Sequence, residues 1–227
     1  KEGWFFRAGD MEEYYALLPE TKSFLSRVVK AFKHQGAELV LVAVPPRSLS
    51  AEEFIDMSQP MQRTFEARNA EANYRDLLKS LSATGARVVD LMEVSQEYDS
   101  ETDQHFFFKR DNHWTPFGAK VTAAEVAEVL ETYPEFQEAK KKTFVTDRDG
   151  LLPMKNEMAL EIQRLCRGDI PAEMFPEYTT TEEAGAGEEA LFGDASDAPP
   201  LVLLGSSYSD TPDFNFEGFL AEATGLD

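Results

Sequence analysis

Asp111 and His113 are the first residues in the sequence whose types and spacing suit catalysis. They lie in the segment KRDNHWTPFGAK, residues 109–120, with one residue between them. In an extended segment this spacing places both side chains on the same side of the chain, where a carboxylate can orient an imidazole that acts as a base. A histidine beside a tryptophan and a proline also occurs as a core or capping residue, so the pair alone leaves both interpretations open. His34, near a helix end, and His105, in the aromatic run HFFF, have weaker claims.

A serine that such a base can activate follows the apolar run at residues 201–204. The sequence LVLLGSSYSD turns at Gly205 and then offers the hydroxyls of Ser206, Ser207 and Ser209. A strand, a glycine turn, a serine and a helix in this order form a nucleophile elbow. A serine hydroxyl is a weak nucleophile unless a base lies within hydrogen-bond reach. The segment therefore predicts a nucleophile near the Asp-x-His pair without deciding which serine it is.

The first half of the sequence alternates helical and strand-like patterns that would position these segments. Apolar residues recur at helical spacing over residues 14–36 and 61–85. A continuous apolar run at 39–44 follows the first helix, which is typical of a strand buried on both faces of a parallel sheet. The segment ARVVDL at 86–91 follows the second helix and predicts a second buried strand. With residues 201–204 as a further strand, we expect an α/β fold whose central parallel sheet is flanked by helices. The carboxyl ends of its strands would converge on one crevice.

The second half is less regular. Thr115 suits an N-cap and Pro116 the first turn of a helix, and residues 214–225 form an amphipathic helical pattern. Between these helices we expect an irregular insertion over about residues 134–198. Its last part, residues 180–198, is acidic, small and turn-rich, which predicts an exposed and mobile loop.

Length and charge limit the possible functions. A chain of 227 residues with 42% hydrophobic content is long enough for one sizeable core, so we expect a single domain over residues 1–227. Its net charge of −20 opposes binding to nucleic acid and to anionic lipid. The single cysteine, Cys166, cannot form an intramolecular disulfide or a cysteine-based zinc site and is expected to be a small buried residue. We therefore expect no nucleic-acid partner, no metal and no cofactor.

Taken together, the two segments resemble a known family. The sequence FFFKRDNHWTPFGA, followed far downstream by LLGSSYSDTPDFNF, is similar to the paired motifs of the alginate O-acetyltransferase family of AlgJ and AlgX proteins. That family places Asp-x-His-Trp-[Ser/Thr] before Gly-[Thr/Ser]-Ser-[Tyr/Phe]-[Ser/Thr]. The opening KEGWFFRAGD and the segment LVAVPPRSLS also resemble the family, so the likeness covers most of the chain. It implies an SGNH-hydrolase-like fold with a permuted motif order.

The resemblance implies a role for each residue of the two motifs. Ser207 corresponds to the nucleophile, His113 to the general base and Asp111 to the residue that orients His113. Ser206 stands where the family often has threonine, and a backbone N–H at or beside Ser207 is expected to join an oxyanion hole. Three further residues are expected to contact the substrate: Tyr208, Trp114 and Arg47.

The resemblance also implies an exported O-acetyltransferase. An acetyl group from a membrane-bound O-acyltransferase would pass to Ser207 as an acyl-enzyme and end on a hydroxyl of an exported polysaccharide. Two alternatives stay open: a carbohydrate acetylesterase with the same Ser-His-Asp triad, and a non-catalytic scaffold that binds polysaccharide through exposed aromatics such as Trp4 and Tyr208. The family implies a periplasmic location, and because the chain starts at Lys1 rather than methionine, we expect that an upstream signal or membrane anchor was removed. The family usually continues past its last helix, so we expect the chain to be truncated after Asp227.

Charge favours a neutral polymer over alginate, which is a polyanion. The basic residues are scattered apart from KKK at residues 140–142. A domain with a net charge of −20 needs a local basic groove to hold a polyanion. We therefore expect a neutral or weakly charged exopolysaccharide, such as cellulose.

Overall fold

The structure is a computed structural model that describes residues 1–154, 157–166, 170–183 and 201–226. The chain divides into two compact units, which are described one at a time below. The first comprises Lys1–Glu97 and Lys109–Asn112, and the second comprises Tyr98–Phe108 and His113–Asp227. The single domain expected over residues 1–227 stays a prediction.

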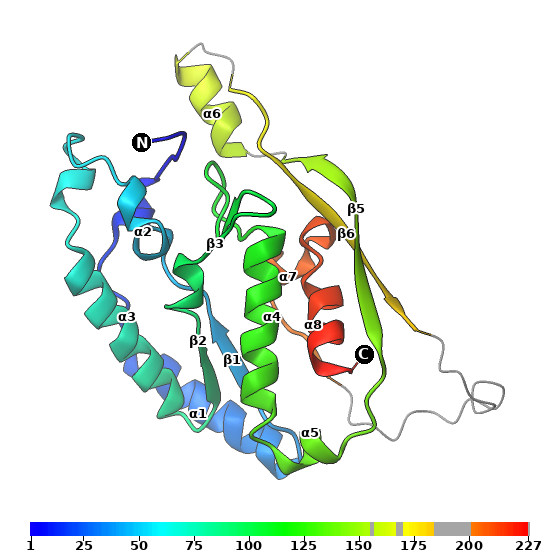
Figure 1. Cartoon of the computed structure of the whole chain (residues 1–227). Coiled ribbons are helices and arrows are strands. Elements are labelled where there is room, and N and C mark those ends of the chain that lie inside the picture. The colour runs from blue at the N-terminus through cyan, green and yellow to red at the C-terminus, as the bar shows by residue number, and fades with distance from the viewer. Residues whose placement is uncertain (155–156, 167–169, 184–200, 227) are drawn as a thin grey trace. The chain divides into compact units, whose positions relative to one another are not determined.

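The first unit contains a parallel pair of strands with helices beside it (Figure 1). Strands β1 (Val40–Ala43) and β2 (Arg87–Asp90) pair from Val40 opposite Arg87 to Ala43 opposite Asp90. Its elements also include α1 (Pro19–His34), α2 (Arg47–Ser50), α3 (Ala67–Ser82) and 3-10 helices at Ala8–Met11, Glu52–Phe54, Gln62–Thr64 and Val94–Gln96. The predicted order of helix, strand, helix and strand is confirmed.

The core of the first unit lies around α3. Its fully buried members include Leu49, Phe65, Tyr74 and Leu78. The Tyr74 hydroxyl donates a hydrogen bond of 2.6 Å to the backbone oxygen of Ala43, which ties α3 to β1. Burial raises the pKa of this hydroxyl, so it stays protonated and continues to donate at ordinary pH.

The second unit contains the remaining elements. They are β3 (Tyr98–Asp99), β4 (Gln104–His105), α4 (Pro116–Leu130), α5 (Pro134–Glu138), β5 (Phe144–Pro153), α6 (Glu157–Cys166), β6 (Met174–Glu182), α7 (Ser207–Asp210), a 3-10 helix at Pro212–Phe214 and α8 (Phe216–Thr224). Helix α4 begins as predicted, because the Thr115 hydroxyl accepts a 3.2 Å hydrogen bond from the Gly118 N–H and Pro116 occupies the first turn.

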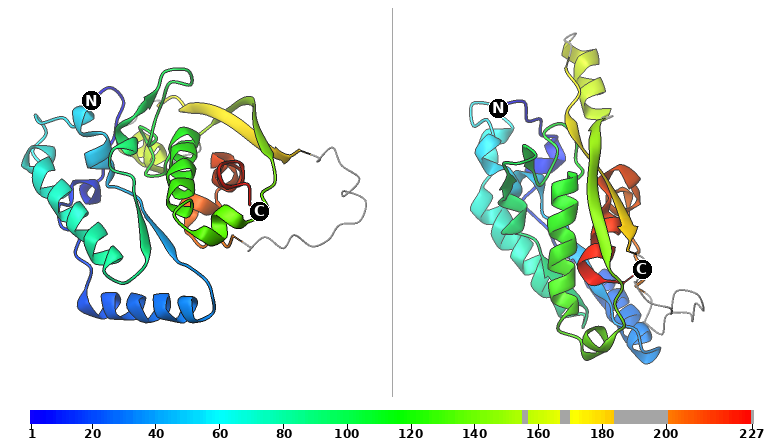
Figure 2. Two further views of the ribbon diagram at one scale, coloured as in Figure 1. Left: turned by 60° about the horizontal axis from the view of Figure 1, so that its bottom comes forward. Right: turned by 45° about the vertical axis from the view of Figure 1, so that its right-hand side comes forward.

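Strands β5 and β6 form a long antiparallel ribbon where we expected an irregular insertion. The ribbon has one irregularity in its register, between Arg148 and Gly150. Helix α8 packs between α4 and this ribbon (Figure 1 and Figure 2). The expectation of a mobile loop over residues 180–198 is wrong for residues 180–182, which belong to β6. From residue 184 on that expectation lies outside the described residues, as does the side chain of Cys166.

The strand expected at residues 201–204 is absent from the described structure. These residues adopt no regular secondary structure, and the side chains of Val202 and Leu204 are exposed. Among the described strands, β1 and β2 alone are parallel, and Val42 of β1 is partly exposed rather than buried on both faces. None of the described helices is both long and apolar enough to cross a bilayer.

Candidate active site

The structure brings His113 and Ser207 together. The Nε2 atom of His113 lies 2.7 Å from the Oγ atom of Ser207, across 94 positions of sequence. This distance allows a hydroxyl to donate to the ring when the ring proton is on Nδ1. The pair predicted from the two motifs therefore has the geometry of a nucleophile and its base.

Two short antiparallel segments, residues 106–108 and 113–115, place His113, and we call this pair of segments the arm. Phe107 and Trp114 form an antiparallel bridge, the N–H of Phe108 donates to the His113 oxygen at 3.2 Å, and the N–H of Thr115 donates to the Phe106 oxygen at 2.8 Å. The aromatic run on this arm is buried. His113 therefore lies between a rigid arm and the capped start of α4.

A tight turn places Ser207. Ser206 is the N-cap of α7, and its backbone oxygen accepts 3.0 Å hydrogen bonds from the N–H groups of Ser209 and Asp210. The Ser209 hydroxyl donates to the same oxygen at 3.2 Å. At Gly205 a Cβ would lie only 1.8 Å from the Ser209 Oγ atom, so glycine lets the chain turn closely here. Within the described structure, Ser207 is thus the serine of the three that meets His113.

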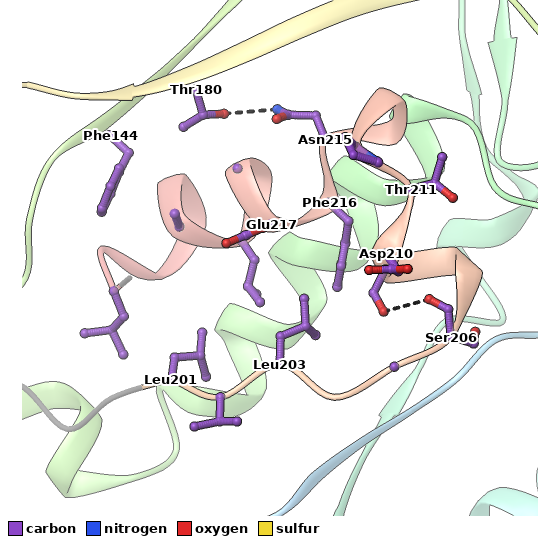
Figure 3. A pocket seen from close by; sticks show the side chains of 18 of the residues that line it. Phe144, Thr180, Leu201, Leu203, Ser206, Asp210, Thr211, Asn215, Phe216 and Glu217 are labelled. Carbon is purple, nitrogen blue, oxygen red and sulfur yellow. Dashed lines mark hydrogen bonds between the residues drawn. The ribbon is translucent and has the colours of Figure 1, made fainter.

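A cavity of about 1200 Å³ opens beside this turn (Figure 3). Ser206 and Ser207 contribute to its lining, and Leu201, Leu203 and Phe216 lie on its apolar walls. Its charged residues are the carboxylates of Glu182, Asp210 and Glu217, and none of the described residues that line it is a lysine or an arginine. The space beside the serine is therefore mixed apolar and acidic.

Aromatic side chains surround the imidazole. The ring centroid of Tyr208 lies 5.0 Å from that of His113 and 5.2 Å from that of Trp114. Tyr208 is half-buried, so a contact with substrate stays a prediction for it. Trp114 is only 2% exposed, and its ring packs on Phe216 at 4.8 Å. The Trp114 ring is therefore part of the core of the second unit, and its expected contact with substrate stays a prediction.

Arg47 is held by contacts within the first unit, and its expected contact with substrate stays a prediction. Its side chain is 3% exposed and donates hydrogen bonds to the oxygens of Phe5 and Lys109 and to the carboxylate of Asp10. Its guanidinium lies 5.3 Å from the ring centroid of Trp4. Trp4 is buried as well, which corrects the expectation that it is an exposed aromatic.

Asp111 is 7% exposed. It belongs to the first compact unit, whereas His113 belongs to the second. Its action on the His113 ring therefore stays a prediction. Among the described residues, no group of three or more His, Cys, Asp or Glu side chains is placed to hold a metal ion.

Comparison with known proteins establishes the family around this pair. Residues 1–227 match the family model described as the SGNH hydrolase-like domain, acetyltransferase AlgX. The chain belongs to this family. The resemblance predicted from the two motifs and the SGNH-hydrolase-like fold class are both confirmed.

Individual AlgX and AlgJ proteins are similar over the whole chain. The alginate biosynthesis protein AlgX of Pseudomonas putida is 30% identical over 227 residues, which cover 99% of this chain and 47% of that protein. The probable alginate O-acetylase AlgJ of Pseudomonas aeruginosa is 28% identical over 243 residues, covering 100% of this chain and 59% of that protein. The solved structure of Pseudomonas aeruginosa AlgX superposes with a TM-score of 0.85 at 30% identity, covering 99% of this chain and 52% of that one. The chain thus spans about half the length of these curated relatives.

Two residues beside the AlgX-type pair were missed from the sequence. The ring centroid of Phe214 lies 5.6 Å from that of His113, and Asn215 adopts a left-handed conformation with φ 53° between Phe214 and Phe216. The segment FNF carried the available signal, since asparagine is among the residues that enter this conformation. The sequence pattern alone places these residues only in the apolar pattern of a helix.

Proposed function

We propose that this AlgX-family chain is the catalytic part of an O-acetyltransferase that esterifies polysaccharide hydroxyls. The observation that carries the proposal is the 2.7 Å approach of His113 Nε2 to Ser207 Oγ. Family membership supports the acyl chemistry. The relatives named as an alginate biosynthesis protein and a probable alginate O-acetylase support a polysaccharide acceptor.

The reaction would proceed through a seryl ester. The Ser207 oxygen attacks the carbonyl carbon of an acetyl ester while His113 Nε2 takes the hydroxyl proton. The donor oxygen then leaves with that proton, and the acetyl group stays on Ser207. In the second half, His113 takes the proton of a sugar hydroxyl, the sugar oxygen attacks the acyl-enzyme, and Ser207 regains a proton as it leaves.

The acetyl source and the location belong to the same proposal. The likeness to alginate O-acetylation proteins favours a membrane-bound O-acyltransferase as the acetyl source and the periplasm as the compartment. Asp111 would fix the His113 tautomer that leaves Nε2 free to accept a proton.

An acetylesterase would use the same two residues, because only the final acceptor differs. Water then replaces the sugar hydroxyl at the acyl-enzyme. The scaffold alternative is weaker than the sequence alone suggested, since Trp4 is buried and the serine and histidine are paired.

The test is the initial rate of hydrolysis of an aryl acetate by the parent chain and by Ser207→Ala. We expect Ser207→Ala to lose about three or more orders of magnitude in rate, as the loss of a triad nucleophile does. Ser206→Ala is the matched control, since Ser206 contributes its backbone oxygen to the turn and should retain most activity. Equal thermal midpoints would show that the variants are folded.

Two outcomes decide among the alternatives. Parent protein with no turnover above buffer would favour the scaffold and refute the enzyme. Acetyl transfer to an oligosaccharide, detected as a mass increase of the sugar, separates the transferase from an esterase that releases acetate only.

A further inference from the structure

The imidazole of His113 is held between two aromatic rings in the second unit. Tyr208 lies 5.0 Å away with an interplanar angle of 52°, and Phe214 lies 5.6 Å away with an angle of 40°. These separations fall in the range of favourable ring contacts. Tyr208 lies in the turn that carries the nucleophile, and Phe214 ends the 3-10 helix that follows that turn.

Phe214 is itself fixed by other core rings. It is 2% exposed, and its ring centroid lies 5.6 Å from that of Phe108 and 6.3 Å from that of Phe175 on β6. Phe108 and Phe175 also pack on each other at 5.1 Å. Phe214 therefore has little freedom to change rotamer, and it forms a rigid wall for the imidazole.

A hydrogen bond from Asn215 to Thr180 on β6 stabilises the turn that follows Phe214. The Asn215 side-chain amide donates to the Thr180 hydroxyl at 3.0 Å (Figure 3), and that hydroxyl lies 2.7 Å from the hydroxyl of Thr146 on β5. Asn215 ends the 3-10 helix and caps α8 in a left-handed conformation. This turn directs Phe214 to His113 and Phe216 to Trp114.

We propose that Phe214 is a positioning residue for the reaction, which keeps His113 Nε2 directed at Ser207 Oγ. The proposal rests on the proposed function, because it assigns His113 the role of base. Without the Phe214 ring, the imidazole can rotate into the vacated space. The fraction of molecules with a serine-to-histidine hydrogen bond then falls, while the cavity beside Ser207 is unchanged because Phe214 does not line it.

The kinetic test compares Phe214→Leu with Phe219→Leu. Phe219 is also 2% exposed, but its ring contacts Tyr178 at 5.2 Å rather than His113. We expect Phe214→Leu to lower kcat on an aryl acetate by about tenfold to hundredfold, the scale of a misplaced catalytic group, with KM little changed. Phe219→Leu should lower the thermal midpoint similarly and keep kcat near the parent value. Equal losses of kcat in the two variants would overturn the proposal.

A spectroscopic test separates this proposal from the proposed function. Long-range proton–nitrogen spectra of the full chain, labelled with ¹⁵N histidine and assigned with His113→Gln, report which ring nitrogen carries the proton. At mildly alkaline pH we expect a single His113 tautomer, protonated on Nδ1, in the parent and in Phe219→Leu. In Phe214→Leu we expect nitrogen chemical shifts that are averaged over the two tautomers. This result in a protein without esterase activity would refute the enzyme but keep the positioning role. An unchanged His113 tautomer in Phe214→Leu would refute the positioning role, even in an active enzyme.

Discussion

At the residue scale, a serine and a histidine need a third group that decides which ring nitrogen is protonated. Asp111 is the predicted group, and it is 7% exposed. We expect Asp111→Asn to lower turnover of an aryl acetate by about three to four orders of magnitude, because the amide favours the wrong tautomer of the base. The measurement is kcat/KM at fixed pH.

Asp213→Asn is a suitable control for Asp111→Asn. Asp213 is exposed and lies next to Phe214. Its replacement by asparagine removes the same charge near the site without removing the predicted partner of His113, so this variant should keep most activity. If both variants lose similar activity, the loss in Asp111→Asn comes from the change in local charge and not from the orientation of His113. If Asp111→Asn keeps near-parent activity, the orienting role is wrong.

The sequence predicts residues whose role follows from a short local motif, but it does not predict which residues are buried by contacts with distant segments. The serine and the histidine follow from short motifs whose chemistry is local to each segment. The prediction that Arg47 and Trp114 contact substrate takes no account of their burial. Their burial depends on contacts with distant segments, such as the bond from Arg47 to the Lys109 oxygen, which no local pattern reveals. The role of Phe214 depends on the left-handed turn at Asn215.

At the element scale, the start of α4 is packed directly on the arm that carries His113. A Cβ at Gly118 would lie 2.3 Å from the Phe106 oxygen and 2.9 Å from the Trp114 Cβ. Because this oxygen belongs to the backbone, it cannot move without moving the arm. Overpacking costs about 1–3 kcal/mol, which exceeds the roughly 0.5–1 kcal/mol that alanine gains over glycine in a helix.

We therefore expect Gly118→Ala to lower both the thermal midpoint and the rate on an aryl acetate. Gly9→Ala is the matched control, because a Cβ at Gly9 would meet nothing within 4 Å. Thermal unfolding followed by circular dichroism, together with the initial rate, measures both effects. If Gly118→Ala were as stable and as active as Gly9→Ala, this prediction would be wrong, because the start of α4 could then move away from the arm without loss of stability or activity.

Elements with a strong period were predictable, whereas the β5–β6 ribbon was not. Helices α1 and α3 follow from apolar residues at helical spacing, β1 from a continuous apolar run, and β2 from the short apolar segment ARVVDL. The ribbon contains charged residues, Gly150 and Pro176, so its local pattern indicated irregular structure. Its strands form because they pair with each other over the full length of β5. The apolar run at 201–204 predicted a strand, but its described residues pair with no other strand.

At the scale of the whole molecule, negative charge is concentrated where the substrate would bind. The chain carries a net charge of −20, and residues 201–227 contain five carboxylates and neither lysine nor arginine. Glu182, Asp210 and Glu217 line the cavity beside Ser207. A polyuronate approaching this part of the chain meets like charge, whereas a neutral glycan does not.

We therefore expect acetyl transfer to a neutral glucan oligosaccharide to exceed transfer to an oligouronate of equal length at low salt. Added salt should raise the oligouronate rate and leave the neutral rate nearly constant, because the screening length falls from about 30 Å at 0.01 M to about 8 Å at 0.15 M. Mass spectrometry of the acetylated sugars measures both rates with a common acetyl donor.

The double variant Asp210→Asn with Glu217→Gln should narrow the difference between the two transfer rates at low salt. Glu222→Gln is the control, because Glu222 lies outside the cavity lining, and it should leave this difference unchanged. An oligouronate rate that is higher at low salt and falls as salt is added would instead show an attractive basic surface. Lys109 and Arg110 would then be the first residues to replace, since they precede Asp111 in the sequence.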